Sequence, residues 1–411
     1  MINYEQFQLP NGLEVYVHED KTSPMAVMNL LYKVGSRNER PEKTGFAHLF
    51  EHLMFGGSAN IPSYDEPLQK VGGENNAFTS PDITNYYITL PAVNLETAFW
   101  LESDRMMSLS FDPKVLEVQR SVVIEEFKQR YLNQPYGDVW LKLRPLAYQK
   151  HPYRWATIGK EISHIEKATM EDVKDFFYRH YRPNNAVLVV AGNVTVAEVE
   201  RLSKKWFGPI PAGEPGATNL PVELGQTALR TLDLEGQVPA DALYMAFHMP
   251  GRLASNYHSV DLLSDVLGRG KSSRTYEKLV EKDRLFNSLS TYVLGSIDPG
   301  LMMIEGKLVE GVNLAAAEQA VWQLLEDFKG NAPDEEELQK VKNKAESTLV
   351  FSEVELLNRA MNLAFAASLN TPDMVNQEAA MIQAVKVEDM MADATHMLRP
   401  ENASVLRYHR S

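Results

Sequence analysis

Two histidines and a glutamate occupy positions 48, 51 and 52, and their spacing suits metal chemistry. On a helix, His48 and His52 project from one face with Cβ atoms about 5–6 Å apart, so both imidazoles can bind a single cation. Glu51 shares this face, where its carboxylate can reach a metal-bound water without being a ligand. Because catalytic zinc typically takes three protein ligands and one water, the pattern predicts a zinc site that needs one more ligand.

Chance is the alternative explanation of this pattern. With only 10 histidines among 411 residues, a pair four positions apart with a glutamate between them is uncommon. The order His-x-x-Glu-His is also the inverted form of a zinc-peptidase motif. We therefore favour a metal site over a coincidence.

The third ligand should be a carboxylate or an imidazole from another element. The helical stretch 112–133 contains Glu125 and Glu126 directly after the apolar run 122–124. A glutamate on a helix ordinarily faces solvent, but the apolar run places this pair on a mostly buried helix. From the pattern alone, a ligand and a solvated side chain are equally supported.

The composition restricts the chemistry further. The chain has no cysteine, which excludes disulfides, cysteine-ligated zinc, iron–sulfur clusters and a thiol nucleophile. A formal net charge of −14 gives no electrostatic support for binding nucleic acid or an anionic membrane. Neither a spanning apolar run nor a signal-peptide pattern is visible. We expect a cytoplasmic protein, or a periplasmic one if a leader was removed.

Hydrophobic periodicity predicts the elements that position these residues. Strands are expected at 13–17, 26–34, 84–90, 186–191 and 243–249. Helices are expected at 44–55, 93–109, 113–134, 170–180 and 257–267. The first of these helices carries His48 and His52 and ends at the glycine pair 56–57.

The length predicts two or more domains, and a segment dense in proline and glycine, 208–225, divides the chain into similar halves. We expect a zinc-binding domain at 1–210, a linker at 211–226 and a homologous domain at 227–411. A strand followed by a helix recurs in the second half. Superposing the two helix ends places Val260, Leu263 and Ser264 opposite His48, Glu51 and His52, so only the first copy could bind a metal.

Taken together, these motifs resemble the pitrilysin-type (inverzincin, M16 family) zinc metallopeptidases, in particular bacterial two-domain members related to the mitochondrial processing peptidase. The resemblance covers essentially the whole chain and is carried by the zinc motif, 72–79 with Asp82 and Tyr86, 120–126, 151–153 and 181–186. It implies an α+β chain of two homologous mixed α/β domains with the LuxS/mitochondrial-processing-peptidase-like metallohydrolase fold. Each domain would be a mostly antiparallel sheet with helices packed on one face.

The resemblance also implies roles for residues at the metal. His48, His52 and Glu126 would bind one zinc ion per chain, and Glu51 would be the general base of peptide hydrolysis. Members of the family often have a supporting glutamate seven residues before the third ligand. That position is Gln119 here, so a charged contact from it is in question.

A substrate-binding strand is implied by the stretch that follows Gly72-Gly73. It resembles the family's edge strand, which pairs with the substrate backbone, and its matching residues are Asn76, Ala77, Phe78 and Thr79. Without the zinc motif beside it, the stretch would be interpreted as an ordinary hairpin turn.

The second half departs from the family pattern. Members that act as one chain or as homodimers supply an arginine and, seven residues later, a tyrosine that polarise the substrate carbonyl. The aligned positions here are Val280 and Asn287, which cannot do this, although Arg274, Tyr276 or Arg284 could take over. We therefore expect the zinc-bearing subunit of a heterodimer whose homologous partner carries the Arg/Tyr pair, with a homodimer as the alternative.

The leading hypothesis is a zinc-dependent endopeptidase that acts on peptides or unfolded polypeptides. A non-catalytic structural or peptide-binding subunit and a zinc hydrolase of a non-peptide substrate are the alternatives. The presence of Glu51 beside the histidines argues against a structural subunit, since such a role needs no general base.

Overall fold

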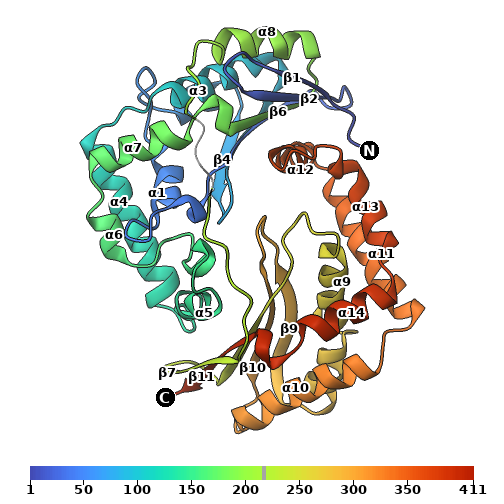
Figure 1. The fold of residues 1–411 in the computed structure, drawn as a ribbon. Helices are drawn as coiled ribbons and strands as arrows, with labels where there is room; N and C mark the ends of the chain where they lie inside the picture. Colours follow the sequence, from blue (N-terminus) through green and yellow to red (C-terminus); the bar gives the residue numbers. More distant parts are fainter. Residues whose placement is uncertain (215–218) are drawn as a thin grey trace. The chain divides into compact units, whose positions relative to one another are not determined.

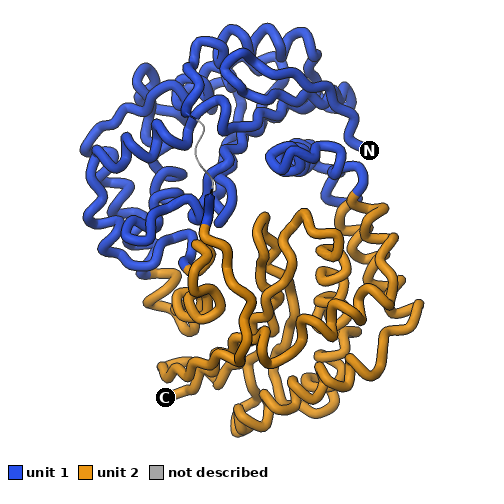
Figure 2. Tube along the Cα trace, in the orientation of Figure 1, with its two compact units in different colours: residues 1–128, 155–220, 350–377 blue, residues 129–154, 221–349, 378–411 orange. Residues whose placement is uncertain are grey.

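The computed structural model describes residues 1–214 and 219–411 (Figure 1). Contacts divide the chain into two compact units, each built from three separate stretches (Figure 2). Unit 1 contains 1–128, 155–220 and 350–377, and unit 2 contains 129–154, 221–349 and 378–411. Part of the predicted linker, residues 215–218, lies outside the described residues, and the predicted domain boundaries stay a prediction.

Within the described residues, unit 1 is built on a six-stranded sheet of order β1-β2-β6-β3-β5-β4. Only the pair β2 and β6 is parallel, and β4 forms one edge of the sheet. The strand bounds are β1 Glu5–Gln8, β2 Glu14–Glu19, β3 Met25–Tyr32, β4 Glu74–Thr79, β5 Thr84–Pro91 and β6 Ala186–Gly192.

Unit 2 has a five-stranded sheet of order β7-β11-β8-β10-β9 in the part of the chain that the structure describes. Again one pair, β7 and β11, is parallel and the others are antiparallel. The strand bounds are β7 Arg230–Gly236, β8 Ala242–His248, β9 Phe286–Leu294, β10 Leu301–Leu308 and β11 Ala403–Arg410. The expected architecture of two mixed α/β units is confirmed.

Helices complete both units. Those of unit 1 are α1 Phe46–Leu53, α2 Asp65–Lys70, α3 Leu95–Met107, α4 Pro113–Phe127, α6 Ile162–Glu166, α7 Met170–His180, α8 Val196–Trp206 and α12 Leu356–Ser368. Those wholly in unit 2 are α5 Val139–Ala147, α9 Tyr257–Gly268, α10 Leu314–Gly330 and α14 Val387–Met397. Helices α11 Glu335–Ser352 and α13 Met374–Ala384 cross from one unit to the other. None of the described helices is both long and apolar enough to cross a bilayer.

The helix that carries the histidines is shorter than predicted. It was expected over 44–55 but extends over Phe46–Leu53. The hydroxyl of Thr44 does not cap it, because that hydroxyl lies 2.8 Å from His164 Nδ1 and accepts a hydrogen bond from the Lys160 N–H. The N-cap is instead Gly45, whose φ of 87° lies in the left-handed region that favours glycine.

The helix predicted over 113–134 also ends early. Helix α4 stops at Phe127, and the chain continues as a π-helix over Lys128–Leu132. Over a single turn, periodicity does not distinguish the 3.6-residue period of an α-helix from the wider turn of a π-helix, so the sequence pattern continues through the change.

The apolar side of α1 packs into an aromatic cluster of unit 1. Phe50 stacks on Tyr181 with 5.3 Å between ring centroids and contacts Phe176 at 4.8 Å. Tyr32 of β3 contacts both Tyr181 and Tyr86 of β5. This cluster fixes the rotation of α1, because its large aromatic side chains bury extensive apolar surface.

A buried ion pair lies beside the same cluster. Arg105 and Glu102 of α3 are both about 1% exposed, and two hydrogen bonds of 2.8 and 2.5 Å join them. The guanidinium contacts the rings of Phe55, Tyr64 and Tyr86, and the Tyr64 hydroxyl donates to Glu102 at 2.6 Å. Phe55 follows the end of α1 and Tyr86 pairs with Ala77 of β4, so this ion pair supports both α1 and β4.

We predict that Glu102→Gln destabilises the protein by about 3–5 kcal/mol, because it leaves the Arg105 charge buried without its counterion. Urea denaturation followed by circular dichroism measures the change. Glu66→Gln is the control, since Glu66 pairs with Lys70 on the surface, and its midpoint should match the wild type. Equal midpoints for both variants would contradict the prediction.

Candidate metal centre

His48 and His52 project side by side from α1, one helical turn apart. Their ring centroids are 4.9 Å apart and the ring planes are nearly perpendicular. The His48 side chain is 12% exposed and that of His52 is 24% exposed, so both reach the surface while the opposite side of α1 is buried. The amphipathic pattern of α1 therefore places the imidazoles where water has access.

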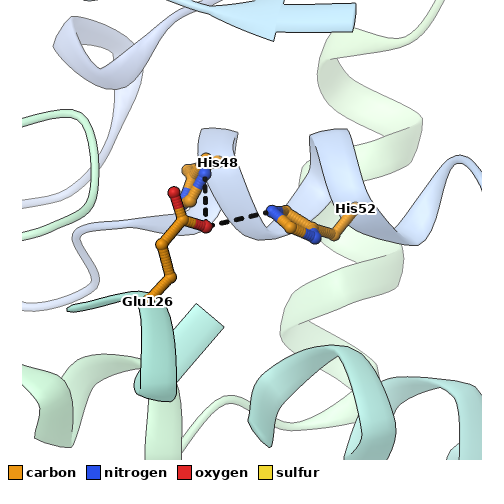
Figure 3. A group of neighbouring side chains, drawn as sticks. All are labelled: His48, His52 and Glu126. Carbon is orange, nitrogen blue, oxygen red and sulfur yellow. Dashed lines mark ion pairs between the residues drawn. The ribbon is translucent and has the colours of Figure 1, made fainter. Parts of the chain in front are cut away.

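Glu126 reaches these imidazoles from α4, which packs against α1. Its Oε2 atom lies 3.5 Å from Nε2 of His48 and 3.5 Å from Nε2 of His52 (Figure 3). Its neighbour Glu125 is 61% exposed and forms an ion pair with Lys128. The sequence pattern supported a metal ligand and a solvated side chain equally for this glutamate pair. In the structure, Glu126 faces the histidines and Glu125 faces solvent.

Local features hold α4 in this orientation. The Asp112 side chain accepts a hydrogen bond from the Lys114 N–H, and Pro113 occupies the first turn, as is common at helix starts. Leu116, Val123 and Phe127 are buried and anchor the inner side of the helix. Val123 lies three residues before Glu126 and therefore on the same side of α4, so its burial turns the Glu126 carboxylate toward α1.

The donor set suits a zinc ion. Ligand atoms of His48, His52 and Glu126 all lie within 4.8 Å of one another. Zinc binds imidazole nitrogen and carboxylate oxygen at about 2.0–2.2 Å, and tetrahedral geometry then separates ligand atoms by roughly 3.3–3.6 Å. The 3.5 Å distances from Glu126 to both imidazoles match this separation. Three such ligands with solvent access would correspond to a catalytic rather than a closed structural site.

Glu51 lies outside this ligand group and faces β4. Its Oε2 atom accepts a hydrogen bond of 2.6 Å from the Thr79 hydroxyl. Burial raises the pKa of the Glu51 carboxyl, whereas the Thr79 hydrogen bond and nearby His52 act in the opposite direction. The carboxylate is therefore held between the histidines of α1 and the strand β4.

Strand β4 offers an edge that no other described strand covers. Asn76 and Phe78 are exposed, Phe78 by 41% of its surface. Ala77 and Thr79 alternate with them, are half-buried, and lie on the face toward Glu51. An open edge presents backbone N–H and C=O groups that can pair with an extended peptide.

The remaining predicted site residues lie in less distinctive surroundings. Gln119 is half-buried on α4, two turns before Glu126. Val280 lies in a π-helix, Tyr276–Lys282, and packs against the core of unit 2. The Asn287 side-chain amide donates to the Leu308 carbonyl at 2.9 Å, and Arg274 forms an ion pair with Glu337.

Two contacts at the site were not predicted from the sequence. The Thr79 hydroxyl bonds to Glu51, although we expected only a backbone role for this residue. Glu39 accepts hydrogen bonds from the backbone N–H groups of Gly45 and Ala47 at the start of α1. The one available signal for Glu39 was that α1 begins with a glycine, which has no side chain to cap it.

Two protein-family models match the chain. The model described as "Insulinase (Peptidase family M16)" matches residues 14–160, and the model described as "Peptidase M16 inactive domain" matches 167–345. His48, Glu51, His52 and Glu126 all lie within the first of these matches.

Individual relatives agree with these models. The zinc protease PqqE of Helicobacter pylori is 33% identical over 346 residues, which cover 82% of this chain and 78% of that protein. The mitochondrial-processing peptidase subunit beta of Saccharomyces cerevisiae is 28% identical over 221 residues, or 53% of this chain and 46% of that protein. A crystal structure of a protease from Helicobacter pylori has a TM-score of 0.93 at 28% identity, covering 99% of this chain and 100% of that one. These findings confirm the resemblance, and the chain belongs to the M16 peptidase family.

Proposed function

We propose that the protein is a zinc-dependent endopeptidase of peptides or unfolded polypeptides. The observation that carries the proposal is the 3.5 Å approach of one Glu126 oxygen to both imidazoles of α1, with Glu51 beside the group but outside it. His48, His52 and Glu126 would hold one zinc ion per chain. Relatives that bear the name zinc protease, such as PqqE, support this choice of metal.

A zinc ion bound by these residues would act as a Lewis acid toward the peptide carbonyl and lower the pKa of a water molecule. Glu51 is the general base: its carboxylate takes a proton from the attacking water and delivers it to the leaving amine. The Thr79 hydroxyl holds this carboxylate by a 2.6 Å hydrogen bond. Because the bond comes from β4, the base keeps a constant position relative to the substrate strand.

Substrate binding is assigned to the open edge of β4, at Asn76, Ala77, Phe78 and Thr79. A peptide that adds a strand here is bound through its main chain, which gives affinity with little dependence on sequence. Only an extended segment can pair in this way. The preferred substrates are therefore short or unfolded polypeptides.

The zinc site would belong to the first domain, at 1–210, and the second, at 227–411, would not bind metal. The second domain also lacks the expected carbonyl-polarising donors, since Val280 has none and the Asn287 amide already donates to Leu308. We therefore propose that a homologous subunit with the Arg/Tyr pair completes the enzyme as a heterodimer. The yeast relative, named as a subunit of a peptidase, supports this arrangement.

We predict that Glu51→Gln keeps about one zinc per chain and lowers peptide hydrolysis by about 10²–10⁴-fold, because the general base is lost. Elemental analysis measures the zinc, and a quenched fluorescent peptide library measures hydrolysis. Glu125→Gln, which changes an exposed glutamate paired with Lys128, should match the wild type. Zinc binding by the wild type without any hydrolysis, even after the homologous chain with the Arg/Tyr pair is added, would favour a non-catalytic subunit.

We predict that Glu126→Gln loses zinc while Glu125→Gln retains it. A neutral amide is a much poorer zinc ligand than a carboxylate, and only Glu126 approaches the imidazoles. Zinc content after dialysis against a weak chelator distinguishes the two variants. Retention of zinc by Glu126→Gln would remove Glu126 from the ligand set.

We predict that adding a homologous chain that carries the Arg/Tyr pair but lacks the zinc motif raises hydrolysis at least about 10²-fold, the usual effect of one oxyanion donor. Titrating that chain into a fixed amount of this protein measures the effect and its stoichiometry. If the isolated protein has full activity that falls on dilution, the homodimer is correct and the heterodimer is not.

A further inference from the structure

The segment 35–45, between β3 and α1, bonds to α1 through a buried glutamate. Glu39 is 7% exposed, and its two carboxylate oxygens accept hydrogen bonds from the Gly45 N–H at 2.9 Å and the Ala47 N–H at 2.8 Å. Burial raises the pKa of the Glu39 carboxyl, so these N–H donors offset a desolvation cost. A carboxylate here also interacts favourably with the helix dipole.

Among the described residues, no local side chain caps the start of α1. The N-cap is a glycine, and α1 has no side-chain cap hydrogen bond. The Thr44 hydroxyl is engaged with His164 and Lys160 instead. Glu39, distant by six residues from Gly45, therefore satisfies N–H groups that a local cap would ordinarily satisfy. Ala47 directly precedes His48, so this capping acts within the turn that carries the first histidine.

The beginning of the same segment bonds to the turn between β4 and β5. The Ser36 and Arg37 N–H groups donate to the carbonyls of Ser80 and Pro81, at 3.3 and 2.9 Å. The Arg37 guanidinium forms a 3.0 Å ion pair with Asp82, and both side chains are largely buried. Thr79, the last residue of β4, directly precedes this turn.

Gly35 shows how closely the segment and the turn approach each other. A Cβ atom added there would lie 2.5 Å from backbone atoms of Ser80 and Pro81, which cannot move aside as a flexible side chain could. Trp155 adds a further bond, since its Nε1–H donates to the Ser36 carbonyl at 2.9 Å. The segment is therefore fixed at its β4 end as well as at α1.

From these two attachments we infer that Glu39 and Arg37 are positioning residues, through which segment 35–45 sets the placement of the metal-binding helix relative to the substrate strand. This inference rests on the proposed function. The 2.6 Å hydrogen bond from Thr79 to Glu51 joins β4 to α1 directly. The segment and this bond therefore hold α1 and β4 in one arrangement. Neither residue touches the reacting atoms.

The two ends of the segment should give different defects. Glu39→Gln turns an amide N–H₂ toward a backbone N–H and weakens the start of α1, so the zinc affinity should fall about 2- to 30-fold, the range expected for a lost helix cap. Arg37→Gln releases the turn after Thr79, so kcat at saturating zinc should fall about 10- to 100-fold with unchanged zinc affinity. A residue that matters only for overall stability would produce neither pattern.

The test measures zinc affinity by chelator competition, kcat and KM on a quenched peptide, and the thermal midpoint. Glu42→Gln is the matched control, because Glu42 is exposed on the same segment. The control should equal the wild type in all measurements. The inference is overturned if Glu39→Gln binds zinc as the wild type does, or if Arg37→Gln has wild-type kcat.

Failure of the proposed function gives a different result. A wild type that binds zinc but hydrolyses no peptide, both alone and with the homologous chain that carries the Arg/Tyr pair, refutes the peptidase, while the zinc affinity of Glu39→Gln still tests the inference. A wild type that binds no zinc overturns both. If Glu39→Gln does not fold, the Arg37→Gln result decides: wild-type kcat rejects the inference, and a lowered kcat with unchanged zinc affinity supports it.

Discussion

The metal centre depends on one geometric constraint: a carboxylate on α4 must meet two imidazoles on α1 within about 3.5 Å. The two helices are separated in sequence by the strands β4 and β5 and the helices α2 and α3, so the distance is set by packing. Aromatic residues beneath α1 fix its rotation, and Val123 and Phe127 fix that of α4. Since close-packed interiors allow little adjustment, small errors in either helix would separate the ligands.

Two carboxylates near this site, those of Glu51 and Glu39, are partly or fully buried, and burial imposes a desolvation cost on their charged form. Burial raises the pKa of both Glu51 and Glu39, and each carboxyl accepts hydrogen bonds that oppose this effect. Glu51 bonds to the strand β4 and Glu39 bonds to the start of α1. Polar groups that are desolvated and hydrogen-bonded have few alternative arrangements, so these bonds organise the site before a substrate binds.

Local sequence was sufficient to predict the metal helix but not its surroundings. The spacing of His48 and His52 identified α1, because ligands four residues apart need only a helix to meet. Glu125 and Glu126 were indistinguishable, because neighbouring residues on a helix differ by about 100° in direction and the sequence does not reveal which direction faces α1. The hydrogen bonds of Thr79 with Glu51 and of Glu39 with the start of α1 join residues from separate elements, so no local sequence pattern predicts them.

Local sequence also does not predict which elements of the fold pack together. Helix α12 belongs by sequence to the second half but packs on β3 and β6 of unit 1. Its buried face is rich in alanine, with Ala360, Ala364 and Ala367. An apolar face predicts that a helix packs against another element, but it does not identify which sheet that element belongs to. Periodicity therefore predicted five of the eleven described strands and five of the fourteen described α-helices, while the other elements and the order in which the chain alternates between the two units required the structure.

Among the described residues, the second unit offers no counterpart of the candidate metal centre. Val260, Leu263 and Ser264, expected opposite His48, Glu51 and His52, are all buried in α9. Helix α9 is buried along its whole length, whereas α1 leaves its histidines half-exposed. A metal site on α9 would need both ligands and solvent access, and in the described residues the only group with ligand atoms that converge is that of His48, His52 and Glu126. The family model described as "Peptidase M16 inactive domain" matches residues 167–345, a range that includes α9, and its description agrees with the lack of converging ligand atoms on this helix.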